Sequence, residues 1–234
     1  MNQRREALKR RAAEKAFEQV RSGMVLGLGT GSTVAHLLTL LSEALASGKL
    51  TDVVGVPTSL QTEQRAASLD IRLIGLGDRD RVDLTIDGAD EISPDLDLIK
   101  GGGGALLREK MVAQASARVV IIADESKCVE RLGSTFALPV EVVRWGWEAQ
   151  ARYLERCGAE VVMRSGPDRL PAVSDNGHVF LDCHFPDGIE DPAALEDRLA
   201  RRAGIVETGL FLGLASEAVV ASQDEVRVIR RNAR

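Results

Sequence analysis

The sequence predicts an α/β protein: a doubly wound, Rossmann-like parallel sheet domain with a smaller inserted α+β lobe. In the first half of the chain, short apolar runs alternate with helical patterns. These runs are rich in β-branched residues and almost uninterrupted, which is typical of parallel strands covered on both faces. After Lys127 the pattern changes to strand, helix and strand, followed by the turn-rich segment "GPDRLPAVSDNG". We therefore expect a Rossmann-like domain of residues 1–132 and 206–234, and a lobe of residues 133–205.

The elements of the larger domain follow from this alternation. Residues 1–17 predict an exposed first helix. Strands are expected within residues 24–29, 52–59, 71–77, 82–90 and 118–126, and helices within residues 32–48, 60–69 and 105–116. The apolar segments at 209–222 and 225–230 predict a return of the chain to this domain.

The lobe contains one helix with clear end signals. We expect strand, helix and strand within residues 136–165, and a further strand at 178–185. The helix that follows has Asp191 as its predicted N-cap, Pro192 at its first position and Gly204 as its predicted C-cap. Trp145 and Trp147 are expected to pack at a domain or subunit contact.

Composition excludes several classes of protein. The chain has 234 residues, 44% of them apolar, 28% charged and 3% aromatic, and its net charge is −5. Few aromatic residues and a negative charge argue against nucleic-acid binding. No apolar run approaches the length that spans a membrane. The N-terminus lacks the apolar core of a signal peptide, and Glu6 and Glu14 count against a transit peptide.

The cysteines and histidines predict neither disulfides nor a metal site. Three cysteines, Cys128, Cys157 and Cys183, are an odd number without a CxxC pair. The three histidines, His36, His178 and His184, lack ligand-like spacing. We therefore expect a reducing, cytoplasmic location and no metal.

The segment "GLGTGST", residues 27–33, lies between a predicted strand and a predicted helix. Its glycines admit a phosphate close to the backbone, and the N–H groups at the helix N-terminus favour the dianion. Thr30, Ser32 and Thr33 offer hydroxyl donors. A dinucleotide fingerprint would need glycine at position 32, and a P-loop would need a Lys-Ser or Lys-Thr pair. The pattern favours a phosphate site over these two, and a tight turn without a ligand is the remaining alternative.

The segment "VDLTIDGADEI" brings Asp87, Asp90 and Glu91 together at the end of a predicted strand. Acids that repel one another at such a position suit proton transfer. Their spacing does not match a calcium-binding loop. A solvated acidic turn is the simpler alternative.

The segment "KGGGGALLREK", residues 100–110, places four glycines between Lys100 and a predicted helix. Such a run is entropically costly unless something requires bare backbone. The N–H groups of Gly101, Gly102 and Gly103, together with Lys100, could stabilise an oxyanion. Glu109 has only apolar neighbours one helical turn away, which makes it a better proton acceptor. A flexible loop before a structural helix is the alternative.

Further along, Lys127 follows a predicted strand and could supply positive charge at the same edge of the sheet. An isolated lysine is more often solvated, so this prediction depends on the neighbouring motifs.

Together, "GLGTGST", "DGADE", "KGGGGALLREK", "ADESK" followed by "LG", "LPVEV", "SDNG" and "VETGLF" resemble the type A family of ribose-5-phosphate isomerases, in the family's order and across almost the whole chain. The resemblance implies a cofactor-free, metal-independent aldose–ketose isomerase of the non-oxidative pentose phosphate pathway. It also implies a small sugar phosphate as substrate and a homodimer or homotetramer.

The resemblance also assigns roles to individual residues. It places the catalytic base at Glu109 and the assisting aspartates at Asp87 and Asp90. The substrate phosphate would be bound by residues 29–33, that is, Gly29, Thr30, Gly31, Ser32 and Thr33, with charge from Lys127 and Lys9. Lys9 follows from the resemblance alone.

One departure from the family pattern is Gly104, where the family often has alanine. Another is the segment "VVRWGWEAQAR", which leaves subunit contacts open.

Two other functions remain to be distinguished. A sugar-phosphate-sensing module would keep the phosphate site without a catalytic base. A nicotinamide-dependent dehydrogenase would bind NAD(H), although the strand at residues 52–57 ends without the acidic residue that holds the adenine ribose.

Overall fold

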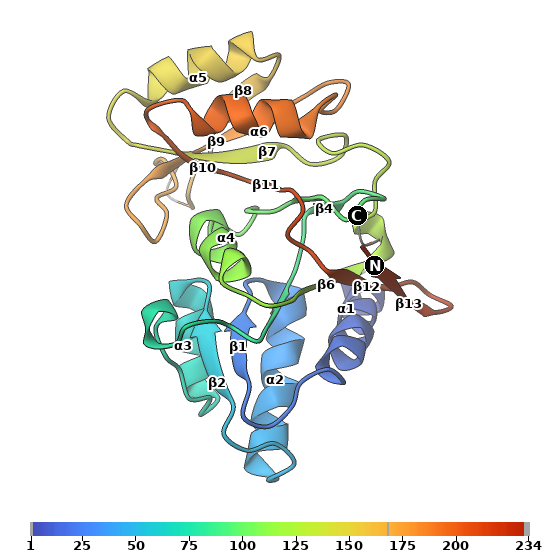
Figure 1. Ribbon diagram of the computed structural model, residues 1–234. Coiled ribbons are helices and arrows are strands. Elements are labelled where there is room, and N and C mark those ends of the chain that lie inside the picture. Colours follow the sequence, from blue (N-terminus) through green and yellow to red (C-terminus); the bar gives the residue numbers. More distant parts are fainter. Residues whose placement is uncertain (1, 168, 232–234) are drawn as a thin grey trace. The chain divides into compact units, whose positions relative to one another are not determined.

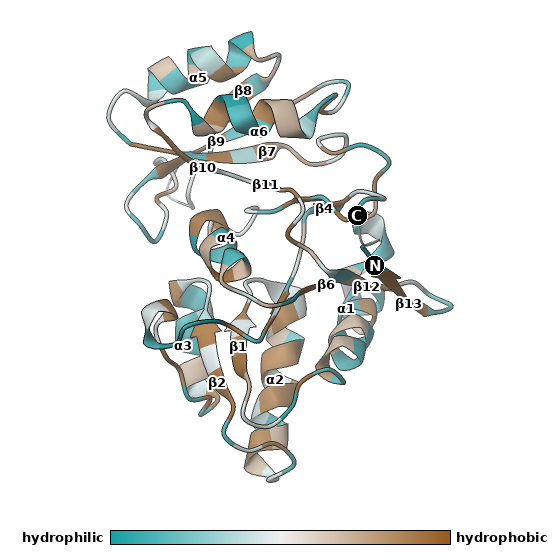
Figure 2. Cartoon of the chain, viewed as in Figure 1, coloured by the Kyte–Doolittle hydropathy of each residue, from teal (hydrophilic) through white to brown (hydrophobic). Residues whose placement is uncertain are grey.

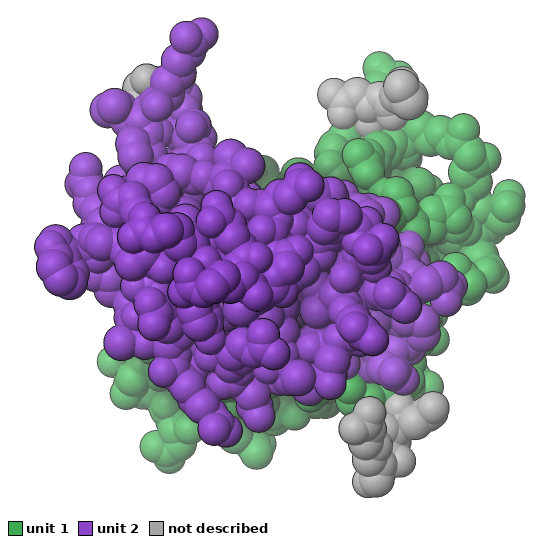
Figure 3. Space-filling view, turned by 90° about the horizontal axis from the view of Figure 1, so that it is seen from above, with its two compact units in different colours: residues 1–89, 108–127, 213–234 green, residues 90–107, 128–212 purple. Residues whose placement is uncertain are grey.

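A computed structural model describes residues 2–167 and 169–231 (Figure 1). The chain divides into two compact units, coloured separately in Figure 3. Unit 1 contains residues 1–89, 108–127 and 213–234, and unit 2 contains residues 90–107 and 128–212. Residues 90–107 thus group with unit 2, whereas the bounds predicted from the sequence assign them to the larger domain. Those bounds stay a prediction.

Unit 1 is built on a six-stranded sheet of order β13-β12-β6-β3-β1-β2. The strands are β1 (Val25–Leu28), β2 (Val54–Pro57), β3 (Leu84–Asp87), β6 (Val119–Asp124), β12 (Glu217–Ala221) and β13 (Val226–Arg230). All neighbouring pairs are parallel except β12 with β13. The predicted Rossmann-like parallel sheet is therefore confirmed. Since the chain passes from β1 outward to β2 and then returns to β3 on the other side of β1, the strand order reverses between β1 and β3.

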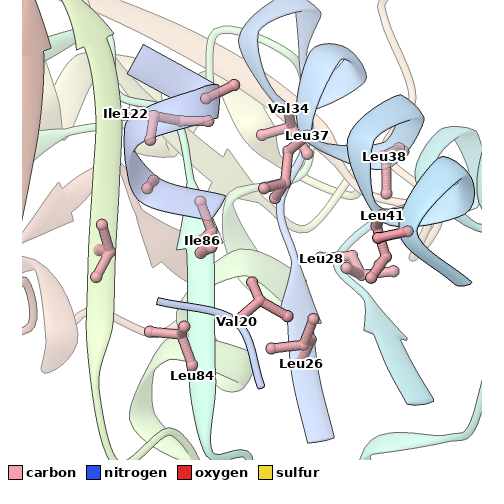
Figure 4. Close-up of a cluster of buried hydrophobic side chains, with 14 of the residues drawn as sticks. Val20, Leu26, Leu28, Val34, Leu37, Leu38, Leu41, Leu84, Ile86 and Ile122 are labelled. Carbon is pink, nitrogen blue, oxygen red and sulfur yellow. The ribbon is translucent and has the colours of Figure 1, made fainter. Parts of the chain in front are cut away.

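Helices cover both faces of this sheet. They are α1 (Asn2–Phe17), α2 (Ser32–Ala46), α3 (Leu60–Ser68) and α4 (Leu106–Gln114), which continues into unit 1 from residue 108. The largest apolar cluster lies between the sheet and α1 and α2 (Figure 4) and includes Val20, Leu26, Leu28, Leu37, Leu41 and Ile86. In Figure 2 the apolar side of α2 and strands β1 and β2 are brown. On the other face, Val112 of α4 packs with Val54 and Val56.

Two details differ from the sequence-based expectations. The first helix is not simply exposed, because Ala12, Ala13 and Ala16 form a fully buried stripe on α1. Within residues 71–77 only an isolated bridge from Leu73 to Gly55 and the start of the short 3-10 helix η1 (Leu76–Asp78) appear. The pairing with β2 is centred on Gly55, which donates to the carbonyl oxygen of Arg72 and accepts from the N–H of Ile74, and a single bridge does not make a strand.

Unit 2 holds two antiparallel sheets. The four-stranded sheet has the order β10-β7-β9-β8. Its strands are β7 (Leu138–Val142), β8 (Glu160–Met163), β9 (Val179–His184) and β10 (Ile205–Thr208). The helices α5 (Trp147–Arg156) and α6 (Pro192–Ala200) contribute Leu154, Leu195 and Leu199 to its apolar core. The lobe therefore combines helices with antiparallel strands, as expected for an α+β fold.

The second sheet of unit 2 was not predicted. It joins β4 (Glu91–Ile92), β5 (Leu98–Ile99) and β11 (Leu210–Phe211). Strands of two residues are too short to give a periodic pattern in the sequence.

The ends of α6 bear out one predicted cap and correct the other. Asp191 is the N-cap, and its side chain accepts a 2.9 Å hydrogen bond from the N–H of Ala194. The C-cap is Arg201 rather than Gly204, since the helix ends at Ala200. Gly204 instead has a left-handed backbone in the turn that follows, with φ +92°.

Among the helices of the described residues, none is long and apolar enough to cross a membrane.

Candidate active site

The loops after β1 and β3 meet where the strand order of unit 1 reverses, which is the place where open α/β sheets bind ligands. The N–H of Thr30 donates to Oδ1 of Asp87 over 3.0 Å. Oδ1 of Asp87 also accepts from the N–H of Gly88 over 2.7 Å, and the side chain is 2% exposed. The predicted phosphate loop and the first predicted aspartate are therefore joined by a hydrogen bond.

Glycine at position 29 makes this approach possible. A Cβ atom there would lie 2.1 Å from Oδ1 of Asp87 and 2.6 Å from the Cα atom of Asp87. Neither atom is the end of a long flexible side chain. Gly29 is thus required by the packing of the two loops, whatever it contributes to binding.

The hydroxyl of Thr30 points into the protein. Its Oγ1 donates to Oγ of Ser59 over 2.8 Å and lies 2.9 Å from Oγ1 of Thr58 and 3.2 Å from Oγ1 of Thr62. In this structure the hydroxyl of Thr30 is therefore engaged within the protein, and its predicted contact with a phosphate stays a prediction. Thr30 supports the loop, because its hydroxyl and its N–H group are both engaged within the protein.

The residues after Thr30 form the start of α2. Gly31 is the N-cap with φ +111°, and the space where its Cβ would lie is open. Ser32 is exposed and Thr33 is half-buried. Lys9 on α1 reaches this point, since its Nζ donates to Oγ of Ser32 over 2.9 Å and to Glu6 over 2.6 Å. The helix N-terminus, one hydroxyl and one ammonium group thus lie together, as a phosphate site requires.

The carboxylate of Glu6 makes hydrogen bonds with Lys9 and His36. The hydrogen bond from Lys9, then that from His36, lowers the pKa of Glu6 below its usual value. The carboxylate therefore stays ionised and keeps Lys9 beside the loop. His36 accordingly has a local structural role on α2.

Glu109 lies in the first turn of α4 and is 4% exposed. The helical neighbours predicted to surround it are all buried apolar residues: Ala105, Leu106, Val112 and Ala113. The four helical neighbours are therefore apolar and buried, as expected. Lys110 is equally buried, at 4% exposure, so burial alone does not single out Glu109. The helix begins at Leu106, one residue later than predicted.

Lys127 ends the 3-10 helix η2 (Glu125–Lys127), which directly follows β6. The preceding Asp124 accepts hydrogen bonds from the N–H and the hydroxyl of Ser126, and a bond of 3.3 Å from Nε of Arg5 on α1. Burial raises the pKa of Asp124, but the hydrogen bonds from Ser126 and the charge of Arg5 outweigh it, so that this pKa lies below its ordinary value. An ionised Asp124 thus fixes the turn that carries Lys127.

In unit 2, the second predicted aspartate contacts the glycine loop, residues 101–104. Oδ2 of Asp90 accepts from the N–H of Gly102 over 2.8 Å. A Cβ at Gly102 would approach Oδ1 of Asp90 to 2.8 Å, and Gly101 has φ +100°. Lys100 is 4% exposed, and its Nζ lies 5.4 Å from the ring centroid of Phe211. The bare backbone of the loop is therefore needed for its contact with Asp90.

Glu91, the third acid of the predicted cluster, has a structural role. It is fully buried, and its carboxylate accepts from the N–H groups of Gly133, Thr135 and Phe136 at 2.5–2.7 Å and from the Thr135 hydroxyl at 2.7 Å. A carboxylate saturated with backbone donors anchors a loop. The cluster of three acids thus divides into Asp87 and Asp90 at the loops described above and Glu91 in a separate anchor.

Sequence reasoning missed Arg164, which follows β8. Its Nη1 donates to the carbonyl oxygens of Gly101, at 2.8 Å, and Gly102, at 3.4 Å. Its other edge pairs with Asp182 of β9 through both carboxylate oxygens. No local signal marks Arg164, because the residues it joins are far apart in the sequence.

No group of three or more His, Cys, Asp or Glu side chains in the described part of the chain is arranged to hold a metal ion.

Comparison with known proteins identifies the family. The family model described as ribose 5-phosphate isomerase A (phosphoriboisomerase A) matches residues 54–225. The chain belongs to the ribose 5-phosphate isomerase A family. The ribose-5-phosphate isomerase A of Chloroflexus aurantiacus is 53% identical to it over 95% of this chain and 92% of the relative. A probable chloroplastic ribose-5-phosphate isomerase 3 of Arabidopsis thaliana is 45% identical over 96% of this chain and 83% of its own length.

Solved structures of ribose 5-phosphate isomerases have the same fold. The enzyme from Plasmodium falciparum matches with a TM-score of 0.95 and 38% identity, over 97% of this chain and all 100% of that chain. A D-ribose-5-phosphate isomerase in complex with phospho-erythronic acid matches with a TM-score of 0.94 and 37% identity, over 97% of this chain and 99% of that chain. The resemblance inferred from the motifs and the predicted fold class are both confirmed.

Proposed function

We propose that this chain interconverts D-ribose 5-phosphate and D-ribulose 5-phosphate, an aldose–ketose isomerisation of the non-oxidative pentose phosphate pathway. The observation that carries the proposal is the 53% identity, over 95% of the chain, to a relative named ribose-5-phosphate isomerase A. The position of phosphate-loop, carboxylate and glycine-loop residues at element ends supports it.

Glu109 is the catalytic base in this proposal. It removes the proton from C2 of the opened aldose, which gives a cis-enediolate, and it returns a proton to C1 to give the ketose. A carboxylate with apolar neighbours is poorly solvated and accepts a proton more readily than one in water. The burial of Glu109, at 4% exposure with apolar neighbours one helical turn away, supports this role.

Negative charge develops on the substrate oxygens during proton removal. Lys100 and the N–H groups of Gly101 and Gly103 stabilise this charge, because preorganised donors need no rearrangement during the reaction. The N–H of Gly102 donates to Asp90 and contributes by orienting that carboxylate. Asp87 and Asp90 relay protons between the oxygens at C1 and C2 and assist opening of the furanose ring. Both carboxylates are oriented by backbone N–H donors.

Residues 29–33 at the start of α2 bind the 5-phosphate, with positive charge from Lys9 and Lys127. The direct contact of Lys9 with Ser32 supports the assignment of Lys9. Thr30 contributes through the shape of the loop. The binding energy of the phosphate positions C1 and C2 for proton transfer.

The test is an isomerase assay of the purified full chain with ribose 5-phosphate as substrate and EDTA present. Formation of ribulose 5-phosphate at undiminished rate is expected, because the resemblance implies an isomerase that needs neither a cofactor nor a metal. Absence of turnover would contradict the proposal, and binding of ribose 5-phosphate without turnover would favour a sensing module.

A homodimer or homotetramer, implied by the resemblance, and a cytoplasmic location, expected from the cysteine pattern, stay part of the proposal. Light scattering coupled to size-exclusion chromatography measures the first, and cell fractionation measures the second.

A further inference from the structure

The guanidinium group of Arg164 joins the glycine loop to the four-stranded sheet of unit 2. Nε and Nη2 of Arg164 donate to the two carboxylate oxygens of Asp182 at 3.0 and 2.5 Å. The Arg164 side chain is 16% exposed and lies over the ring of Phe180, 4.8 Å from its centroid. Planar, bidentate pairing of this kind fixes the orientation of the guanidinium plane.

Because Nε and Nη2 of Arg164 are paired with Asp182, the remaining nitrogen, Nη1, is the one that contacts the glycine loop. It donates to the carbonyl oxygen of Gly101 at 2.8 Å and to that of Gly102 at 3.4 Å. The Gly101 carbonyl also accepts from the N–H of Gly104 over 3.0 Å, which closes a turn. Two successive carbonyl groups of the loop are thus directed to the same cation.

The direction of a carbonyl group sets that of the next N–H group. In a planar trans peptide the C=O and the N–H bonds point in opposite directions. The peptide between Gly101 and Gly102 illustrates this, since its carbonyl accepts from Arg164 while its N–H donates to Asp90 over 2.8 Å. By the same rule, the N–H of Gly103 points away from Arg164.

We propose that Arg164 is a positioning residue for the isomerisation. It holds the carbonyls of Gly101 and Gly102, and this turns the N–H of Gly103 away from Arg164, where it serves as a donor for the substrate oxyanion. This inference rests on the proposed function. Arg164 itself does not touch the substrate. Its effect is transmitted through the backbone of the loop, and Asp182 contributes by fixing the guanidinium plane.

Lysine cannot replace Arg164 in this role. A single ammonium group can pair with Asp182 or donate to the loop carbonyls, but it lacks the planar fork that does both at fixed angles. The substitution Arg164→Lys keeps the charge, so a loss of activity would not arise from a change in net charge. Arg152→Ala is the matched control, because Arg152 is exposed on α5 of the same unit.

The experiment measures kcat and KM for ribose 5-phosphate in the purified full chain. In Arg164→Lys, kcat is expected to fall about 10-fold to 100-fold, as for misplacement of a transition-state donor. KM is expected to change little, since the oxyanion exists only after proton removal. Asp182→Asn should lower kcat in the same direction, and Arg152→Ala should match the wild type. Thermal unfolding by circular dichroism verifies that each variant is folded.

A double variant tests whether the effect passes through Gly103. Proline at position 103 has no N–H group, so Gly103→Pro removes the donor directly. If Arg164 acts through this donor, Arg164→Lys adds no further loss to Gly103→Pro. Hydrogen exchange of residues 101–104 supplies a measurement that does not depend on turnover, and exchange faster than in the wild type is expected for Arg164→Lys.

The outcomes separate this inference from the proposed function. A wild-type chain without isomerase activity would refute the function itself. An active wild type with unchanged kcat in folded Arg164→Lys and Asp182→Asn would overturn the role of Arg164 alone. A rise in KM without a loss of kcat, or full additivity with Gly103→Pro, would overturn it as well.

Discussion

The N–H of Thr30 donates to Oδ1 of Asp87 over 3.0 Å, and this bond joins the loop after β1 to the loop after β3. The two loops can approach because residue 29 has no side chain, since a Cβ there would lie 2.1 Å from the same oxygen.

Gly29→Ala is therefore expected to force the loops apart. We predict a loss of about 1–3 kcal/mol in the free energy of unfolding, the usual cost of overpacking, together with a lower kcat/KM. Gly77→Ala is the matched control, because no atom lies within 4 Å of the added methyl group there. Urea unfolding of both variants measures the difference, and equal stability of the two would contradict the prediction.

Glu109→Gln preserves the shape of the side chain but removes its ability to accept a proton. We expect kcat to fall by about 10²–10⁴, the range for loss of a general base, with little change in KM. Glu63→Gln on the exposed surface of α3 should retain full activity. Near-normal turnover of Glu109→Gln in steady-state assays would rule out this residue as the base.

Lys127→Ala should weaken binding of the substrate phosphate. A hydrogen bond to a charged group is worth about 1.5–3 kcal/mol, so KM is expected to rise by roughly 10-fold to 100-fold. Lys49→Ala removes an exposed lysine of the same unit and serves as the comparison. An unaltered KM for ribose 5-phosphate would exclude a phosphate contact.

Asp124 should make the stability of the protein depend on pH. Its pKa in the folded chain is lower than in the unfolded chain, so its contribution is fully present at pH values above the unfolded pKa. The contribution is lost as the pH falls through the folded pKa. Asp124→Asn should be less stable at pH 7 and lose less stability on acidification. Urea titrations at several pH values measure this, and an acid profile as steep as that of the wild type would be inconsistent with it. Asp95→Asn, at an exposed site, is the control.

Glu91→Ala should destabilise unit 2. It removes the acceptor of three backbone N–H groups and one hydroxyl. Only Gly133 among these donors is buried, and a buried donor left unsatisfied costs about 1–3 kcal/mol, so a loss of about that size is expected. Thermal unfolding measures it, with Glu125→Ala at an exposed site as control. A midpoint equal to that of Glu125→Ala would assign Glu91 no anchoring role.

The features that the sequence predicted well are those with a local cause. β1 and α2 follow from a continuous apolar run and a helical period, and the Asp191 cap follows from the residue types around it. The apolar neighbours of Glu109 were predictable because helical geometry fixes which residues lie one turn away.

The features that it missed depend on contacts between distant segments. Nothing local distinguishes Glu91 from Asp90, although residues 133–136 surround only Glu91 with donors. The Thr30 hydroxyl turns inward because Thr58 and Ser59 approach it from the loop after β2. Arg164 and the two-residue strands likewise have no sequence period to reveal them.

The place of β12 in the sheet has a consequence for biosynthesis. It pairs with β6 in parallel along Glu217–Ala221, yet residues 128–212 of unit 2 are synthesised between the two strands. Until then β6, whose six residues are all buried in the finished protein, presents an unpaired apolar edge. A nascent chain therefore leaves this edge open to association with other chains until β12 is present, and unit 1 completes its sheet only after residues 128–212 have been synthesised.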